Sequence, residues 1–241
     1  MPAPTTPAPT TPARTTPAPS TRLVAAAGLA AAAAGAIFIG VQVGHPPVDV
    51  EHLTTTGMRV REVAKAVMCA LAVVGLAGMF ARSRARLGVV GHVGYALVTI
   101  GYLAMFVTQC LVGFVLPSKA GTDPGYVQDV LDAAIGGSPE GDIGAYPVLF
   151  GVAGLGFSIG GLLFGVAQLR AGVLSRCASA LFAYGTASAL ALAVLPESFN
   201  RPFAVPTGVA LIGLGTSLWR GLRPATSAEA PAVALPGLAT R

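Results

Sequence analysis

Residues 80–88 read Phe80-Ala81-Arg82-Ser83-Arg84-Ala85-Arg86-Leu87-Gly88, which places three arginines in five residues between two long apolar runs. Arginine is costly in hydrocarbon, and short loops rich in Lys and Arg stay on the cytoplasmic side of a membrane. We therefore expect Arg82, Arg84 and Arg86 to determine the topology. This loop should face the cytoplasm and so fix the direction of every other membrane crossing.

The composition indicates a protein whose solvent includes lipid. Of the 241 residues, 54% are hydrophobic and only 10% are charged, whereas a soluble domain is about 25% charged. The net charge is +5, but the basic residues lie at the ends of apolar runs rather than in a patch with interleaved aromatic residues. This pattern favours a lipid bilayer as the partner and argues against nucleic acid.

Long apolar runs recur along the chain. Their lengths are close to the roughly 20 residues that a helix needs to cross the hydrocarbon core. They predict an all-α fold, a polytopic membrane protein with a six-span transmembrane helical bundle over residues 23–221. The expected spans are residues 23–44, 63–81, 88–116, 147–169, 177–195 and 203–219. The Pro/Thr-rich residues 1–22 and the Ala/Pro-rich residues 222–241 have little to bury and are expected to be disordered tails.

Two details of these spans can be predicted from single residues. Lys65 lies just inside the second span, where we expect it to reach the interface and to pair with Glu62 or with Glu51. The third span is the longest run and ends at Pro117, so we expect a tilt or a kink in it.

The longest polar loop, residues 118–146, contains a helix signal. Asp123-Pro124-Gly125 has the form of an N-cap followed by proline at the first helical position. Apolar residues then keep helical spacing until Gly136-Gly137. We expect a short amphipathic helix lying on the extracytoplasmic surface of the bundle.

The distribution of basic residues supports this orientation. With the arginine loop inside and six spans, both termini are cytoplasmic, and ten basic residues fall inside against five outside. Of the acidic residues only Glu229 falls inside. The expected location is therefore the cell membrane, with N- and C-termini in the cytoplasm.

The third span has the most polar face. The third-span stripe steps by three or four residues and consists of His92, Tyr95, Thr99, Tyr102, Phe106 and Gln109. At about 100° per residue these side chains occupy one third of the helix circumference. They could line a ligand cavity or a proton path, or they could hydrogen-bond to neighbouring helices and hold the bundle together.

The fourth span contains two small-residue pairs, Gly156-x-x-x-Gly160 and Gly161-x-x-x-Gly165. This spacing lets two helix backbones approach closely. We expect these four glycines at a helix–helix interface, within a homo-oligomer or with a membrane partner.

No pattern points to a catalytic, cofactor or metal site. No acidic residue lies in the middle of a predicted span, as proton-coupled transporters usually require. The acidic residues of the long loop lack the spacing of a calcium loop, and His45 and His52 lack a third ligand in a known zinc pattern. We therefore expect no cofactor and no enzymatic nucleophile.

Four short segments resemble uncharacterised multi-pass integral membrane proteins of actinobacterial type. These segments are His45-Pro46-Pro47, Gly75-Leu76-Ala77-Gly78-Met79-Phe80, Val115-Leu116-Pro117 and Leu169-Arg170-Ala171-Gly172-Val173-Leu174. The resemblance covers roughly residues 23–222 and implies the architecture but no activity.

Three hypotheses of function follow from the sequence. The first is a non-enzymatic protein that packs with itself or with a partner through the four glycines. The second is a small-solute transporter or channel that uses the third-span stripe, and the third is an intramembrane enzyme.

Overall fold

The computed structural model describes residues 19–190 and 200–221, of which 83% are helical and none is in a strand. The all-α class predicted from the sequence is confirmed for this part of the chain. The tail residues 1–18 and 222–241 lie outside the described residues. The elements are α1 (Pro19–Gly40), α2 (Val50–Leu53), α3 (Thr56–Ser83), η1 (Arg84–Arg86), α4 (Gly88–Cys110), η2 (Leu111–Val115), α5 (Leu116–Lys119), α6 (Pro124–Ala134), α7 (Tyr146–Leu155), η3 (Gly156–Gly160), α8 (Gly161–Ala171), α9 (Arg176–Ser188) and α10 (Asn200–Arg220).

Four helical stretches of the described chain are long and apolar enough to cross a membrane. They are Thr21–Gly40, Thr56–Arg86, Gly88–Lys119 and Tyr146–Ala171. Large apolar side chains point outward along them, among them Leu23, Val89 and Val148, each more than two-thirds exposed. An apolar outer surface is what hydrocarbon requires. These four stretches overlap the first four predicted spans, whereas the predicted fifth span continues into residues 191–195, outside the described residues.

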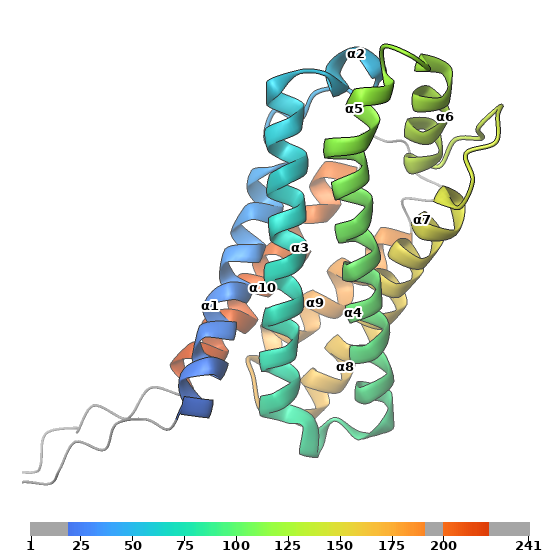
Figure 1. Cartoon of the computed structure of the whole chain (residues 1–241). Helices are drawn as coiled ribbons and strands as arrows, with labels where there is room; N and C mark the ends of the chain where they lie inside the picture. Colours follow the sequence, from blue (N-terminus) through green and yellow to red (C-terminus); the bar gives the residue numbers. More distant parts are fainter. Residues whose placement is uncertain (1–18, 191–199, 222–241) are drawn as a thin grey trace, which may run out of the picture.

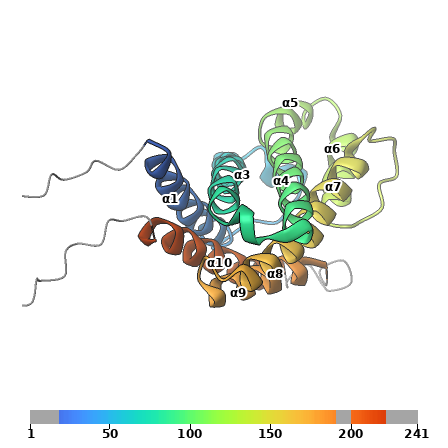
Figure 2. The same ribbon diagram turned by 90° about the horizontal axis from the view of Figure 1, so that it is seen from below.

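The long helices form one bundle (Figures 1 and 2). Helix α1 packs against α3 and α10, α4 packs against α3, η3 and α8, and α9 packs against α8 and α10. Large buried side chains from five of these helices meet in the middle of the bundle: Leu76, Tyr102, Phe164, Phe182 and Leu214.

Small residues set the close spacing of α1. A Cβ added to Gly75 of α3 would lie 2.6 Å from the Cβ of Ala31, and one added to Gly28 would lie 2.7 Å from the carbonyl oxygen of Gly215. Because any larger side chain would collide with backbone, these positions let α3 and α10 touch α1 directly.

Helix α3 begins earlier than the predicted second span. Thr55 caps it, since the Thr55 hydroxyl oxygen accepts from the amide of Met58 at 3.2 Å, and the helix runs from Thr56 rather than from Val63. The segment predicted as a polar loop up to Glu62 is therefore partly helical. An N-capping hydroxyl stabilises a helix start even where the first turns are polar, which the apolar run alone could not indicate.

The third span also continues past Pro117, where the sequence predicts that it stops. The chain passes through the π-helical turn η2, in which the amide of Leu116 donates to the carbonyl of Leu111, five residues back. Proline cannot donate a hydrogen bond and its ring crowds the carbonyl four residues before it. The wider turn accommodates this, so Pro117 lies inside a helix that runs on to Lys119.

Charges separate to the two ends of the bundle. The arginine end carries Arg82, Arg84 and Arg86 in and beside η1, all exposed, together with the ends of α8 and α10. The acidic end carries α2, α5 and α6 (Figure 1). Glu197 and Glu229 lie outside the described residues, and the other eight of the 10 acidic residues are at the acidic end.

Helix α6 begins at the predicted position. Asp123 is its N-cap, since a carboxylate oxygen of Asp123 accepts from the amide of Tyr126 at 3.2 Å, and Pro124 is its first residue. Its buried face, Val127, Val130 and Leu131, joins a second core cluster at the acidic end. The loop helix is therefore fixed to the bundle by its own apolar contacts.

Candidate functional site

Glu62 is the most buried charged side chain of the described chain, with 2% of its surface exposed. The Nζ atom of Lys65, one helical turn later, donates to Oε1 of Glu62 at 2.6 Å. The other carboxylate oxygen, Oε2, is buried and has no hydrogen-bond partner among the described residues. A buried carboxylate oxygen without a donor lowers stability, so this atom calls for an explanation beyond packing.

Glu62 and Lys65 line a cavity of about 210 Å³ at the acidic end. The polar groups that face it besides this pair belong to Thr108 and Gln109 of α4. The Thr108 hydroxyl donates to the carbonyl of Ala104 at 3.0 Å, which leaves its oxygen able to accept. The remaining walls are apolar and come from Val48, Met58, Val112, Leu131, Ala134, Ile135 and Phe150. We call this space the Glu62 cavity.

Gly113 of the π-turn η2 explains how a glutamate can be buried here. A Cβ added to Gly113 would lie 2.9 Å from the Cβ of Glu62, so only glycine allows α3 and η2 to approach at this level. Single π-turns inside α-helices occur frequently at functional sites. The turn begins two residues after Gln109, so it shapes the wall of the Glu62 cavity.

A second, larger cavity of about 500 Å³ lies next to the Glu62 cavity, and Ala134 and Phe150 line both. Its lining is mostly apolar, with Phe38, Met105 and Phe157 as large members. Phe157 belongs to the second π-turn, η3. The Glu62 cavity, with its charged pair, therefore adjoins a larger and mostly apolar cavity, and each lies beside a π-turn.

The third-span stripe does not face one cavity. His92 is exposed near the arginine end, where its Nδ1 donates to the carbonyl of Gly88 at 2.7 Å. Tyr95 stacks on Phe80, with ring centroids 4.2 Å apart. The hydroxyls of Thr99 and Tyr102 are buried without a partner among the described residues. Of the stripe, Gln109 alone lines the Glu62 cavity. Tyr95 and Tyr102 instead pack against aromatic rings of neighbouring helices.

The four glycines of the fourth span lie against helices of the same chain. A Cβ on Gly156 would lie 2.8 Å from Cα of Gly101, and one on Gly165 would lie 2.7 Å from the amide nitrogen of Ala183. Gly160 faces Val98 and Gly161 faces Thr186 in the same way. Contacts with α4 and α9 thus cover all four positions within a single copy of the chain.

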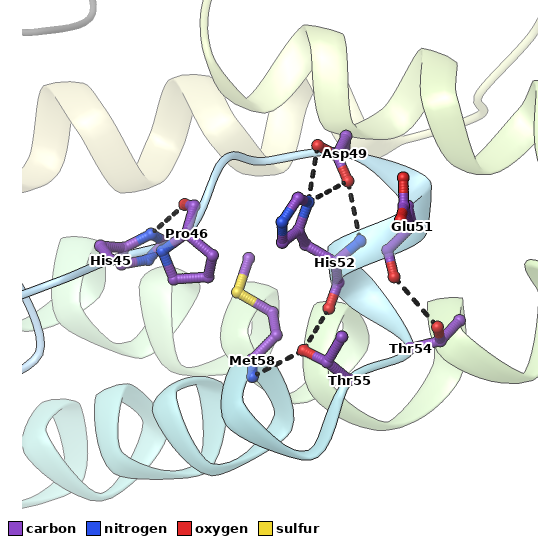
Figure 3. Close-up of polar contacts among 8 residues, drawn as sticks. All are labelled: His45, Pro46, Asp49, Glu51, His52, Thr54, Thr55 and Met58. Atoms are coloured by element: carbon purple, nitrogen blue, oxygen red, sulfur yellow. Dashed lines mark hydrogen bonds and ion pairs between the residues drawn. The ribbon is translucent and has the colours of Figure 1, made fainter.

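Outside the cavity, Asp49, His52 and Asp129 make local hydrogen bonds that hold the chain at the acidic end. Figure 3 shows the segment before α3, where both carboxylate oxygens of Asp49 lie 2.8 Å from Nδ1 of His52 and Asp49 also caps α2. Hydrogen bonds from the His52 amide and ring hold the pKa of Asp49 below its usual value. Asp129 of α6 accepts from the amides of Glu140 and Gly141 in the loop after that helix, both at 3.0 Å. Within the described residues, no three His, Cys, Asp or Glu side chains are grouped to hold a metal ion.

No protein-family model matches the chain. No curated protein and no solved structure matches it either. The site must therefore be interpreted from its own chemistry.

Sequence reasoning missed the burial of Glu62. The sequence does predict the pair with Lys65, and of the two partners offered the structure shows Glu62 rather than Glu51. The sequence does not indicate that Gly113 packs against Glu62, because Gly113 lies 51 positions later and no local pattern connects the two residues. A carboxylate and an amine three residues apart at the end of an apolar run is the one signal that could have indicated the site.

Proposed function

We propose that this chain is a multi-pass protein of the cell membrane that binds a small zwitterionic solute in the Glu62 cavity and carries out no covalent chemistry. The observation that supports this is the unpaired Oε2 of the buried Glu62, beside a lysine in a small cavity. An ionised carboxylate only accepts hydrogen bonds, so this oxygen requires a donor such as an ammonium group.

The pair has unused capacity of both signs. Lys65 has three N–H donors and uses one of them in its hydrogen bond to Glu62 at 2.6 Å. Glu62 accepts that bond with one of its two carboxylate oxygens, and the other has no partner among the described residues. A solute that carries both an ammonium and a carboxylate group could donate to the unpaired Oε2 of Glu62 and accept from the remaining N–H donors of Lys65. It would do so without adding net charge to a buried site. Amino-acid-like molecules have this chemistry, and Gln109 adds an amide that can donate and accept.

Helix–helix association has less support than solute binding. The hypothesis of a packing protein depended on Gly156, Gly160, Gly161 and Gly165, and these glycines face α4 and α9 of their own chain. The transporter hypothesis depended on the third-span stripe, and Gln109 at its end does line a cavity. Solute binding, the step common to carriers and solute sensors, is therefore the function that the geometry favours.

A thermal-shift panel on the full chain in lipid nanodiscs tests this proposal. We expect L-alanine or a larger neutral amino acid to raise the melting temperature by several degrees, since a ligand at a hundredfold excess over its Kd stabilises by about 2.7 kcal/mol. Ethylammonium and acetate, each with one of the two charges, are the matched controls and should have a much smaller effect. Equal protection by ethylammonium alone, or no protection by any of the 20 amino acids, would refute the zwitterion site.

We further propose that α9 and α10 complete six spans, with both termini in the cytoplasm and α6 on the extracytoplasmic side. Two observations support this. Helix α10 packs along α1, the first candidate span, and the ends of α8 and α10 carry Arg170 and Arg220 at the same end as the arginine loop. A cytoplasmic position for this end agrees with the preference of short arginine-rich loops.

Cysteine accessibility tests the orientation. In a chain whose exposed Cys177 is replaced by serine, a cysteine introduced at the exposed Ser138 should react with a membrane-impermeant maleimide in intact cells. One introduced at the exposed Ala85 should react only after the cells are opened. Ser83 is unsuitable as the internal position because it is buried. The reverse labelling pattern would show that the topology is the inverse of the one proposed here.

A further inference from the structure

A cavity of about 290 Å³ lies at the arginine end, between the start of α4 and the end of α8. Two arginines from different helical hairpins, Arg86 and Arg170, line it together with the segment Leu87–Val90 and Ala167. None of these residues lines the Glu62 cavity, whose residues on α3 and α4 lie at the other ends of those two helices.

The two guanidinium groups have no counter-charge in the described chain. Neither guanidinium group has a hydrogen-bond or ion-pair partner among the described residues, and every acidic residue of the described chain lies at the acidic end. Like charges that share one cavity repel each other, and an anion placed between them removes that repulsion. Arginine presents paired N–H groups that match two oxygens of a phosphate.

The cavity also adjoins an exposed apolar surface. Val89 is 79% exposed and Val90 is 46% exposed, at the first turn of a helix that is long and apolar enough to span a membrane. The first amides of α4 are not used by the hydrogen bonds of the helix itself, which adds donors at the same edge. An anion that fits here would therefore have hydrocarbon attached to it.

We propose that this cavity binds the phosphate headgroup of an anionic phospholipid from the leaflet at the arginine end. Arg86 and Arg170 hold the phosphate oxygens, and the acyl chains lie along Val89 and Val90. Basic pockets between membrane helices on the cytoplasmic side are suited to anionic headgroups. The two arginines would thus join the hairpin of α3 and α4 to that of α8 and α9 through a shared lipid.

Lipid retention by the full chain tests the proposal. The protein is reconstituted with phosphatidylglycerol and phosphatidylcholine, extracted in mild detergent, and the bound lipid is counted by native mass spectrometry. We expect the Arg86→Gln/Arg170→Gln variant to retain at least fivefold less phosphatidylglycerol than the parent. The matched control is Arg82→Gln/Arg84→Gln, which removes the same charge from exposed arginines of the same loop that do not line the cavity, and it should retain phosphatidylglycerol like the parent.

Three outcomes overturn the proposal. Equal loss in both double variants would mean a general attraction of the basic surface for anionic lipid. Full retention of phosphatidylglycerol by the Arg86→Gln/Arg170→Gln variant would show that the two arginines do not hold this lipid. Displacement of phosphatidylglycerol by millimolar inorganic phosphate would identify a site for free anions instead. The Arg86→Lys/Arg170→Lys variant, which keeps the charge and loses the paired donors, should fall between parent and glutamine variant. The melting temperatures of the glutamine and lysine variants, compared with that of the parent, show whether the fold is intact.

Discussion

Replacement of Glu62 by glutamine should reduce the affinity for a zwitterionic amino acid by about 10- to 100-fold. A hydrogen bond to a charged group contributes about 1.5–3 kcal/mol, and each 1.4 kcal/mol is a factor of ten in Kd. The amide keeps the size of the side chain but removes the charge that an ammonium group would meet at Oε2. Calorimetric titration of the amino acid that gives the largest thermal shift is the measurement.

The control for Glu62 is Glu51→Gln, which removes a carboxylate from an exposed position at the same end that does not line the cavity. Its Kd should stay within about twofold of the parent. Loss of the partner of Lys65 could also weaken the fold, but Lys65 is 19% exposed and has a long stem, so its ammonium can reach the interface. An unchanged Kd in a Glu62→Gln variant that melts like the parent would exclude Glu62 as a ligand.

Replacement of Gly160 by alanine should destabilise the bundle by about 1–3 kcal/mol, the usual cost of overfilling a packed interior. The added methyl group would collide with the backbone of Val98 and with Leu97 of α4, and backbone cannot move aside without shifting a whole helix. The measurement is thermal unfolding of the purified chain in detergent, followed by circular dichroism.

The matched control is Gly154→Ala on α7, because a Cβ at Gly154 has no neighbour within 4 Å. That variant should melt at or slightly above the parental temperature, since alanine favours a helix over glycine. If both variants melted alike, the close contact of η3 with α4 would not limit stability. If Gly160→Ala stayed folded but lost a dimer, the glycine would act between chains, as the sequence first suggested.

The helices themselves could be predicted because their signal is local. Apolar runs and polar breaks near Gly88 and Pro147 suffice to place four of them, and the Asp123 cap gives the start of α6. The limits of α3 and of the third span were wrong for a local reason as well, since the Thr55 cap and the π-turn before Pro117 do not change hydropathy.

The site was not predictable in the same way because it depends on contacts between distant segments. Helical spacing puts the third-span stripe on one face, but which residues line a cavity is decided by the neighbours: Phe80 covers Tyr95, and Phe157 covers Tyr102. The hydropathy pattern places Glu62 just before the second predicted span, and its burial requires the glycine at position 113 on another helix.

The separation of charge between the two ends of the bundle has an electrical consequence. At the acidic end, eight acidic residues outnumber five basic ones, Arg59, Arg61, Lys65, Lys119 and Arg201 in the first turn of α10. The arginine end holds basic residues alone in the described chain. The molecule is thus a dipole along the long axis of the helical bundle. With the arginine end inside, as proposed, a resting voltage that is negative inside holds it in place, because each elementary charge moved across gains or loses about 2.3 kcal/mol per 100 mV. An energised membrane therefore opposes inversion of the bundle.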